Sequence, residues 1–180
     1  EIANEPAMQG GHGYFFQGTS ADYLDLLATS ASTIRTADPE ALVLTGGQAG
    51  MQPEFTDFWR PVLLEAGGSF DIGNIHSIGS DSSFFSAPYR EFLDSYGHAD
   101  IPFWVTEALL PTMPAPGQRA PTGDQLARDT VTGFASALAD GADRIFNVGP
   151  HDPTGGPGPE SDAAFELLAR SIGGFSSALR

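Results

Sequence analysis

Two glutamates, Glu5 and Glu107, are the side chains of this sequence best placed to do chemistry. Glu107 follows residues 101–105, IPFWV, a run without any charged side chain, and it precedes a Pro-rich stretch that begins at Pro111. Such a run is typical of a strand in a parallel sheet covered on both faces, and we expect Glu107 at its carboxyl end. Ligands bind at that edge of a parallel sheet, so Glu107 is a candidate functional residue. A lone glutamate in such a place more often caps a helix or satisfies a loop.

The start of the chain, EIANEP, repeats this pattern. Another short apolar run is followed by Asn4 and Glu5, and Pro6 ends the expected strand because proline has no backbone N–H to donate. Two strands would then each carry one carboxylate to the same rim of the sheet. A function shared by the two glutamates becomes the better explanation of both.

The two strand ends, N-E-P and V-T-E with two βα units between them, resemble those of the retaining glycoside hydrolases of clan A, which are (β/α)8 barrels. The resemblance implies that Glu5, after the fourth barrel strand, is the acid/base and that Glu107, after the seventh, is the nucleophile. It also implies that Asn4 binds the 2-hydroxyl group of the sugar. His76, which ends the sixth strand, would lie beside the nucleophile or the sugar.

The implied reaction is hydrolysis of a β-linked oligo- or polysaccharide by double displacement. Its transition state resembles an oxocarbenium ion, which one carboxylate stabilises and then captures while a second carboxyl group protonates the leaving oxygen. Retention requires the two groups to lie about 5 to 5.5 Å apart. We therefore expect Glu5 to be protonated and Glu107 to be ionised, in different environments.

Aromatic side chains for stacking on a sugar are harder to assign. The last strand has Phe146 and Asn147 where many members of the clan have a tryptophan under the sugar, which leaves the substrate class open. Loop aromatics could stack on sugar or simply hold their loops to the core; the candidates are Tyr14, Phe15, Phe84 and Phe85.

The rest of the chain alternates between strand and helix patterns. Helices are expected at residues 21–36 with Ser20 as cap, 55–66, 87–96 with Ser86 as cap, 122–141 and 161–172, and further strands at 41–45, 70–78, 101–107 and 144–148. Helical spacing predicts that the fourth helix buries Ala127, Val131, Phe134 and Leu138.

Five successive βα units imply a parallel sheet with right-handed crossovers. If Glu5 closes a fourth barrel strand, residues 1–180 are the C-terminal part of a single incomplete (β/α)8 barrel, since a whole barrel takes about 250 residues. The missing first three units are then the expected partner. The alternative is a self-contained doubly wound α/β binding domain of flavodoxin type. The sequence has no phosphate-binding G-x-G-x-x-G or G-x-x-x-x-G-K motif, and the two Glu strand ends favour the barrel.

Composition restricts the partners. The chain has 23 acidic and 8 basic side chains, a net charge of −15, and such a surface repels nucleic acids and anionic membranes. No run approaches the roughly 18 apolar residues of a membrane span. Cysteine is absent, which excludes disulfides and thiolate metal sites. The chain is expected to begin inside a strand, so the absence of a visible signal peptide leaves secretion open.

No metal or cofactor is expected. The remaining histidines and the acids of the last loop lack metal-ligand spacing; these are His12, His98, His151, Asp152, Glu160 and Asp162. A rival function is that of a barrel-derived protein that binds carbohydrate without cutting it. A separation of the Glu5 and Glu107 carboxyl carbons far beyond about 9.5 Å would favour this rival.

Overall fold

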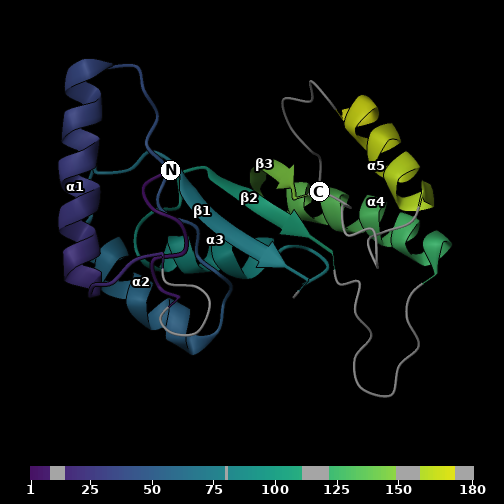
Figure 1. The fold of residues 1–180 in the computed structure, drawn as a ribbon, viewed down its shortest axis with the longest axis horizontal. Helices are drawn as coiled ribbons and strands as arrows, with labels where there is room; N and C mark the ends of the chain where they lie inside the picture. The colour runs from purple at the N-terminus through teal and green to yellow at the C-terminus, as the bar shows by residue number, and fades with distance from the viewer. Residues whose placement is uncertain (9–14, 80, 111–121, 149–158, 173–180) are drawn as a thin grey trace.

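The computed structural model describes residues 1–8, 15–79, 81–110, 122–148 and 159–172. In these residues the elements follow in the order α1 (Ser20–Ala37), α2 (Pro53–Glu65), β1 (Gly73–Ile78), α3 (Ser86–Ser95), β2 (Phe103–Leu109), α4 (Gly123–Ala139), β3 (Ala142–Asn147) and α5 (Pro159–Ile172). The strands form one parallel sheet in the order β1–β2–β3. Figure 1 shows α1 and α2 beside one end of the sheet and α4 and α5 beside the other. The fold is therefore α/β with a parallel sheet, as predicted. None of the described helices is long and apolar enough to cross a membrane.

Strand β2 lies at the centre of the sheet, and its two faces differ in burial. Phe103 and Val105 have no exposed surface, whereas Trp104 and Thr106, on the opposite face, are partly exposed. Phe103 packs edge-on against Tyr89 of α3, with ring centroids 5.4 Å apart. The burial predicted for both faces of this strand is thus complete on the helix-covered face only.

The first two predicted strands are wrong as regular strands, although the chain follows their course. Ile2 donates its N–H to the carbonyl oxygen of Leu44 at 3.2 Å, and Leu44 pairs with Ile72 through a single parallel bridge. Gln48 makes a second single bridge to β1. The ladder is interrupted at residues 46–47, two glycines, which weaken a strand because they have no side chain to pack.

Helix α4 buries a different face from the predicted one. Its buried residues are Leu126, Thr130, Gly133, Phe134 and Ala137. Of the predicted set only Phe134 is among them, and Val131 is 43% exposed. The reason is a close approach at Gly133, where a Cβ atom would lie 2.2 Å from the backbone oxygen of Ser82. Phe134 then packs edge-on against Phe165 of α5, with centroids 5.3 Å apart.

The helices begin within two residues of their predicted starts, but two predicted caps are wrong. Helix α1 is capped by Thr19, not Ser20: the Thr19 hydroxyl accepts the N–H of Asp22 at 3.3 Å, and the Asp22 carboxylate accepts the N–H of Thr19 at 2.7 Å. This reciprocal pair satisfies more backbone groups than a lone Ser20 cap can. Helix α3 follows Phe85 in the left-handed conformation, and Ser86 is its first helical residue.

Candidate active site

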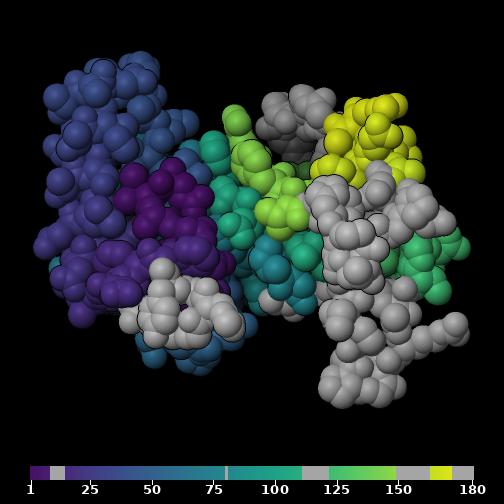
Figure 2. Space-filling view, viewed as in Figure 1, coloured from purple at the N-terminus to yellow at the C-terminus, as the bar shows by residue number. Residues whose placement is uncertain are grey.

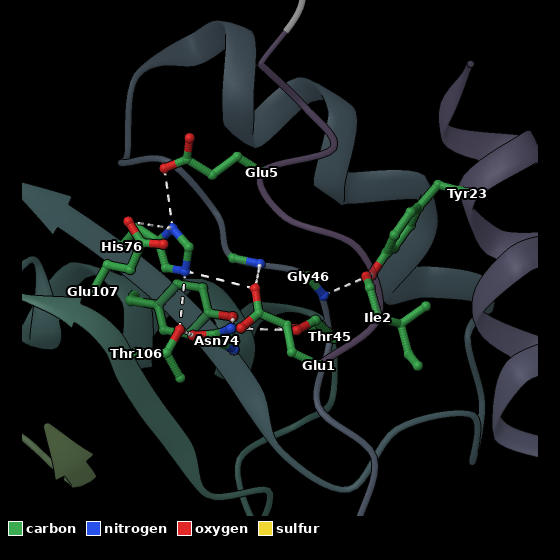
Figure 3. A network of polar contacts seen from close by, with 12 residues as sticks. Glu1, Ile2, Glu5, Tyr23, Thr45, Gly46, Asn74, His76, Thr106 and Glu107 are labelled. Carbon is green, nitrogen blue, oxygen red and sulfur yellow. Dashed lines mark hydrogen bonds and ion pairs between the residues drawn. The ribbon is translucent and has the colours of Figure 1, made fainter. Parts of the chain in front are cut away.

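Glu5, His76 and Glu107 lie together toward the carboxyl ends of β1 and β2 (Figure 3). The Nδ1 atom of His76 lies 3.0 Å from Oε1 of Glu5 and 3.6 Å from Oε2 of Glu107. His76 itself is only 1% exposed. The tertiary structure therefore brings three of the four predicted site residues into one cluster.

The two carboxylates of this cluster are close but differ in environment. A side-chain oxygen of Glu5 and one of Glu107 lie within 4.8 Å of each other. Since a C–O bond adds only about 1.2 Å at each end, the carboxyl carbons lie well inside the 9.5 Å or so that the rival function requires. The side chain of Glu5 is 10% exposed, whereas that of Glu107 is 35% exposed. Two acids in unequal environments can take unequal roles.

A bulge in the sheet directs Glu107 toward His76. Glu107 lies within β2 rather than at its end, because the strand continues to Leu109. Thr106 also contacts His76, with its Oγ1 2.9 Å from Nε2. Consecutive side chains of a regular strand point to opposite faces, so two neighbours cannot normally reach one ring. The β1–β2 register shifts between Ile75 and His76, and this irregularity places His76 opposite Glu107.

Glu5 is held by a bent segment instead of the predicted strand. Ala3, at φ +63°, and Glu5, at φ +39°, are in the left-handed region, which is uncommon for residues other than glycine and is often found at functional sites. The hydroxyl of Tyr23 accepts the N–H of Gly46 at 2.6 Å and donates to the carbonyl of Ile2 at 3.0 Å. Burial raises the pKa of the Tyr23 phenol, which therefore stays protonated and able to donate. Figure 2 shows the N-terminal residues, in purple, on the surface of the molecule.

Replacement of Tyr23 by Phe should lower the free energy of unfolding by about 1 to 3 kcal/mol, because the buried N–H of Gly46 would lose its acceptor. Urea unfolding measures the change. Tyr96→Phe is the matched control, since the hydroxyl of Tyr96 makes no hydrogen bond with a described residue. Equal stability of the two variants would contradict the anchoring role of Tyr23.

Gly47 packs against the ring of His76, and sequence reasoning missed it. A Cβ atom at this position would lie 2.0 Å from Nε2 of His76. The N–H of Gly47 donates to Oε1 of Glu1 at 3.2 Å, and the same oxygen lies 3.7 Å from Nε2 of His76. The available signal was the Gly-Gly pair after the apolar run 41–45, because glycine permits close approach to a neighbouring group.

Asn74 is a second supporting residue that sequence reasoning missed. It is fully buried in β1 and lies on the same face as Thr106, whose hydroxyl donates to Asn74 Oδ1 at 2.7 Å. The Nδ2 atom of Asn74 donates to the carbonyl oxygen of Thr45 at 3.4 Å. The hydroxyl of Tyr89 accepts the backbone N–H of Asn74 at 2.9 Å. The available signal was an amide side chain inside the predicted strand 70–78, because buried polar groups require partners.

The other predicted binding residues do not join the cluster. Asn4 is partly buried, and its side chain makes no hydrogen bond with a described residue. Phe84 is completely buried and so has no surface for a sugar, and Phe85 is partly buried against the core. Phe15 is 54% exposed, and Tyr14 lies outside the described residues.

Glu5, His76 and Glu107 each offer an atom that a metal ion can bind. We assign no metal ion to them: the His76 ring contacts Glu5 through Nδ1 and Thr106 through Nε2, and these contacts hold the ring without an ion. Nε2 of His98, another histidine weighed as a ligand in the sequence, lies 2.8 Å from the carbonyl oxygen of Leu63. The other histidines and acids considered as ligands lie outside the described residues or have no described side chains; they are His12, His151, Asp152, Glu160 and Asp162.

Comparison with known proteins gives matches among solved structures only: no family model and no curated protein matches the chain. The chain is similar to a glucosidase from Croceicoccus marinus, with a TM-score of 0.62 and 16% identity over 88% of this chain and 38% of that one. It is also similar to a GH39 β-xylosidase from Caulobacter crescentus, with a TM-score of 0.63 and 19% identity over 93% of this chain and 40% of that one.

The chain thus spans about two fifths of the length of these two structures. Identities this low show a shared fold and leave the activity of the chain to be argued from its own residues. The chain therefore shares an α/β fold with part of each of these two structures.

Proposed function

We propose that this chain carries the catalytic pair of a retaining glycoside hydrolase that acts on a β-linked oligo- or polysaccharide. One observation carries the proposal: two carboxylates within 4.8 Å of each other, both facing a buried histidine, on a fold shared with part of two glycosidases. The carboxyl carbons then lie at most about 7 Å apart, which is compatible with the roughly 5 Å of a retaining pair, and the N-E-P and V-T-E strand ends favour retention over inversion.

In the proposed reaction Glu107 attacks the anomeric carbon while Glu5 gives its proton to the leaving oxygen. The covalent glycosyl-enzyme is then hydrolysed by a water molecule that Glu5 deprotonates, which restores the acid. The more exposed Glu107 suits a nucleophile that must reach the sugar. The more buried Glu5 is assigned the role of acid/base. Asn4 is proposed to bind the 2-hydroxyl group, since its amide has no other described hydrogen-bond partner.

The rest of the barrel is proposed as the partner of an exposed cluster of Trp104, Arg144 and Phe146, which we call the Trp104 face. The Arg144 guanidinium lies 4.7 Å from the Trp104 ring centroid, and the Phe146 and Trp104 centroids are 5.8 Å apart. Phe146 is 45% exposed. Thr106, on the same side of β2 as Trp104, contacts the site. In a closed barrel this side of the sheet faces the interior, so further βα units would cover it.

A mechanism-based trap tests the catalytic proposal. It uses the complete protein, by which we mean this chain with whatever residues its gene places before Glu1. An aryl 2-deoxy-2-fluoro-β-glycoside slows both steps but keeps a good leaving group, so the glycosyl-enzyme should accumulate. Peptide mass spectrometry should find the sugar on Glu107, and NMR of early products from a natural substrate should show a retained β-anomer. A label elsewhere, an inverted product, or binding of oligosaccharides without any cleavage would contradict the proposal.

Expressed alone, the 180-residue chain should be inactive and should associate, because the Trp104 face and unpaired strand edges would be exposed. Size-exclusion chromatography and a glycosidase assay on the chain and on the complete protein measure the difference. A monomeric chain that unfolds cooperatively and cleaves glycosides by itself would overturn the assignment of a missing barrel partner.

A further inference from the structure

We propose that Thr106 and Asn74 are positioning residues that fix which nitrogen of His76 carries hydrogen. They hold His76 with a proton on Nε2, so that a single further proton is shared between Nδ1 and the Glu5 carboxyl group. The inference about His76 depends only on the hydrogen bonds of this chain. Its consequence for catalysis rests on the function proposed above.

The direction of the hydrogen bonds follows from a backbone carbonyl. The carbonyl oxygen of Thr45 can only accept, so the side-chain group of Asn74 that faces it at 3.4 Å is the amide N–H. The other end of the amide, Oδ1, then accepts the hydroxyl hydrogen of Thr106 at 2.7 Å. A hydroxyl has one hydrogen to donate, so the contact of 2.9 Å between Thr106 Oγ1 and His76 Nε2 requires the hydrogen to be on Nε2.

The opposite set of hydrogen bonds, with the Asn74 amide flipped and no hydrogen on Nε2 of His76, is unfavourable at two places. If the Asn74 amide were turned round, its Oδ1 would face the Thr45 carbonyl oxygen, and two acceptors would meet in a fully buried position. An unprotonated Nε2 would also face Oε1 of Glu1 at 3.7 Å, an oxygen that already accepts the N–H of Gly47. Two separate groups, the Thr45 carbonyl and the Glu1 carboxylate, therefore favour the same tautomer of His76.

The other nitrogen, Nδ1, faces the two proposed catalytic acids. Its contact with Oε1 of Glu5 is 3.0 Å and the contact with Glu107 is longer, at 3.6 Å. A close pair formed by Nδ1 and a carboxyl oxygen requires one proton between them, on Glu5 beside a neutral ring or on Nδ1 beside a carboxylate. The titratable groups that face the ring are the carboxyl groups of Glu1, Glu5 and Glu107.

This shared proton is the one that the proposed reaction uses. It passes to the leaving oxygen when the Glu5 carboxyl group turns toward the substrate, which leaves Glu5 as a carboxylate beside a neutral His76. The water that hydrolyses the intermediate gives one proton back to Glu5. No other proton donor is needed, and Nε2 of His76 keeps its hydrogen throughout.

The experiment is a long-range ¹H–¹⁵N correlation spectrum of the complete protein, selectively labelled with ¹⁵N-histidine and assigned with His76→Gln. Nitrogen chemical shifts distinguish protonated from unprotonated ring nitrogens. His98, whose Nε2 faces a carbonyl oxygen, is an internal reference that does not contact Thr106. The spectrum is compared with those of Thr106→Val, which removes the hydroxyl, and Thr106→Ser, which keeps it.

We expect a protonated Nε2 in the wild type and in Thr106→Ser, whether the shared proton is found on Nδ1 or on Glu5. In Thr106→Val the Nδ1–H tautomer should appear, and cleavage of an unactivated oligosaccharide should fall about tenfold more than that of an aryl glycoside. An unprotonated Nε2 in the wild type would overturn the inference, and so would a Thr106→Val spectrum unchanged at His76. The wild-type spectrum alone shows whether Nε2 of His76 is protonated, even if Thr106→Val does not fold. This test does not depend on whether the protein cleaves glycosides.

Discussion

Replacing Glu107 by Gln in the complete protein should abolish cleavage of every glycoside, whatever its leaving group. Glutamine is nearly isosteric but cannot form the glycosyl ester, so the first chemical step is lost. A loss of at least about a thousandfold, or about 4 kcal/mol of transition-state stabilisation, is expected. Steady-state rates on an aryl glycoside and on an unactivated oligosaccharide measure it. Glu65→Gln, which removes an exposed carboxylate at the end of α2, is the control and should keep wild-type rates.

Replacing Glu5 by Gln should affect the cleavage of the two substrates differently. The unactivated oligosaccharide needs its leaving oxygen protonated and should be slowed by about 10² to 10⁴. An aryl glycoside should still form the intermediate and then accumulate it, because the water that hydrolyses it lacks a base. Stopped-flow assays should therefore show a burst followed by a slow steady state. Equal losses on both substrates for Glu5→Gln, or substantial activity in Glu107→Gln, would show that the roles are assigned wrongly.

Gly47→Ala should disable the site without touching either carboxylate. The added Cβ would lie 2.0 Å from Nε2 and 2.2 Å from Cε1 of His76. The ring cannot easily give way, since its other contacts hold it from Glu5 on one side and Thr106 on the other. Overpacking of this kind costs about 1 to 3 kcal/mol of stability, and displacement of His76 should also lower activity on unactivated substrates.

Gly68→Ala is the matched control for Gly47→Ala. A Cβ atom at Gly68 would meet nothing within 4 Å, so this variant should keep both stability and activity. Urea unfolding and the two-substrate assay are measured on both variants. A Gly47→Ala protein as stable and as active as Gly68→Ala would mean that the loop moves away from His76, and that the tight packing beneath the ring has no role.

The local pattern of apolar and polar residues was sufficient to predict the order of the elements and the strands that carry the site. Apolar runs and helical spacing extend over only a few residues, and they predicted all five helices and the strands β1, β2 and β3. They did not predict the burial of α4, because the approach of Gly133 to Ser82 involves residues far apart in the chain. They also gave regular strands to residues 1–5 and 41–45, where left-handed residues and paired glycines leave only single bridges.

The sequence by itself determined that Glu5 and Glu107 follow strand-like runs, because such runs are recognised from neighbouring residues alone. Only the tertiary structure decided that both acids face one buried ring. The shift of register between Ile75 and His76 cannot be read from either strand, since it arises where two strands pair. The same holds for the chain of hydrogen bonds from Thr45 to His76, because its donors and acceptors come from segments that meet only when the sheet has formed.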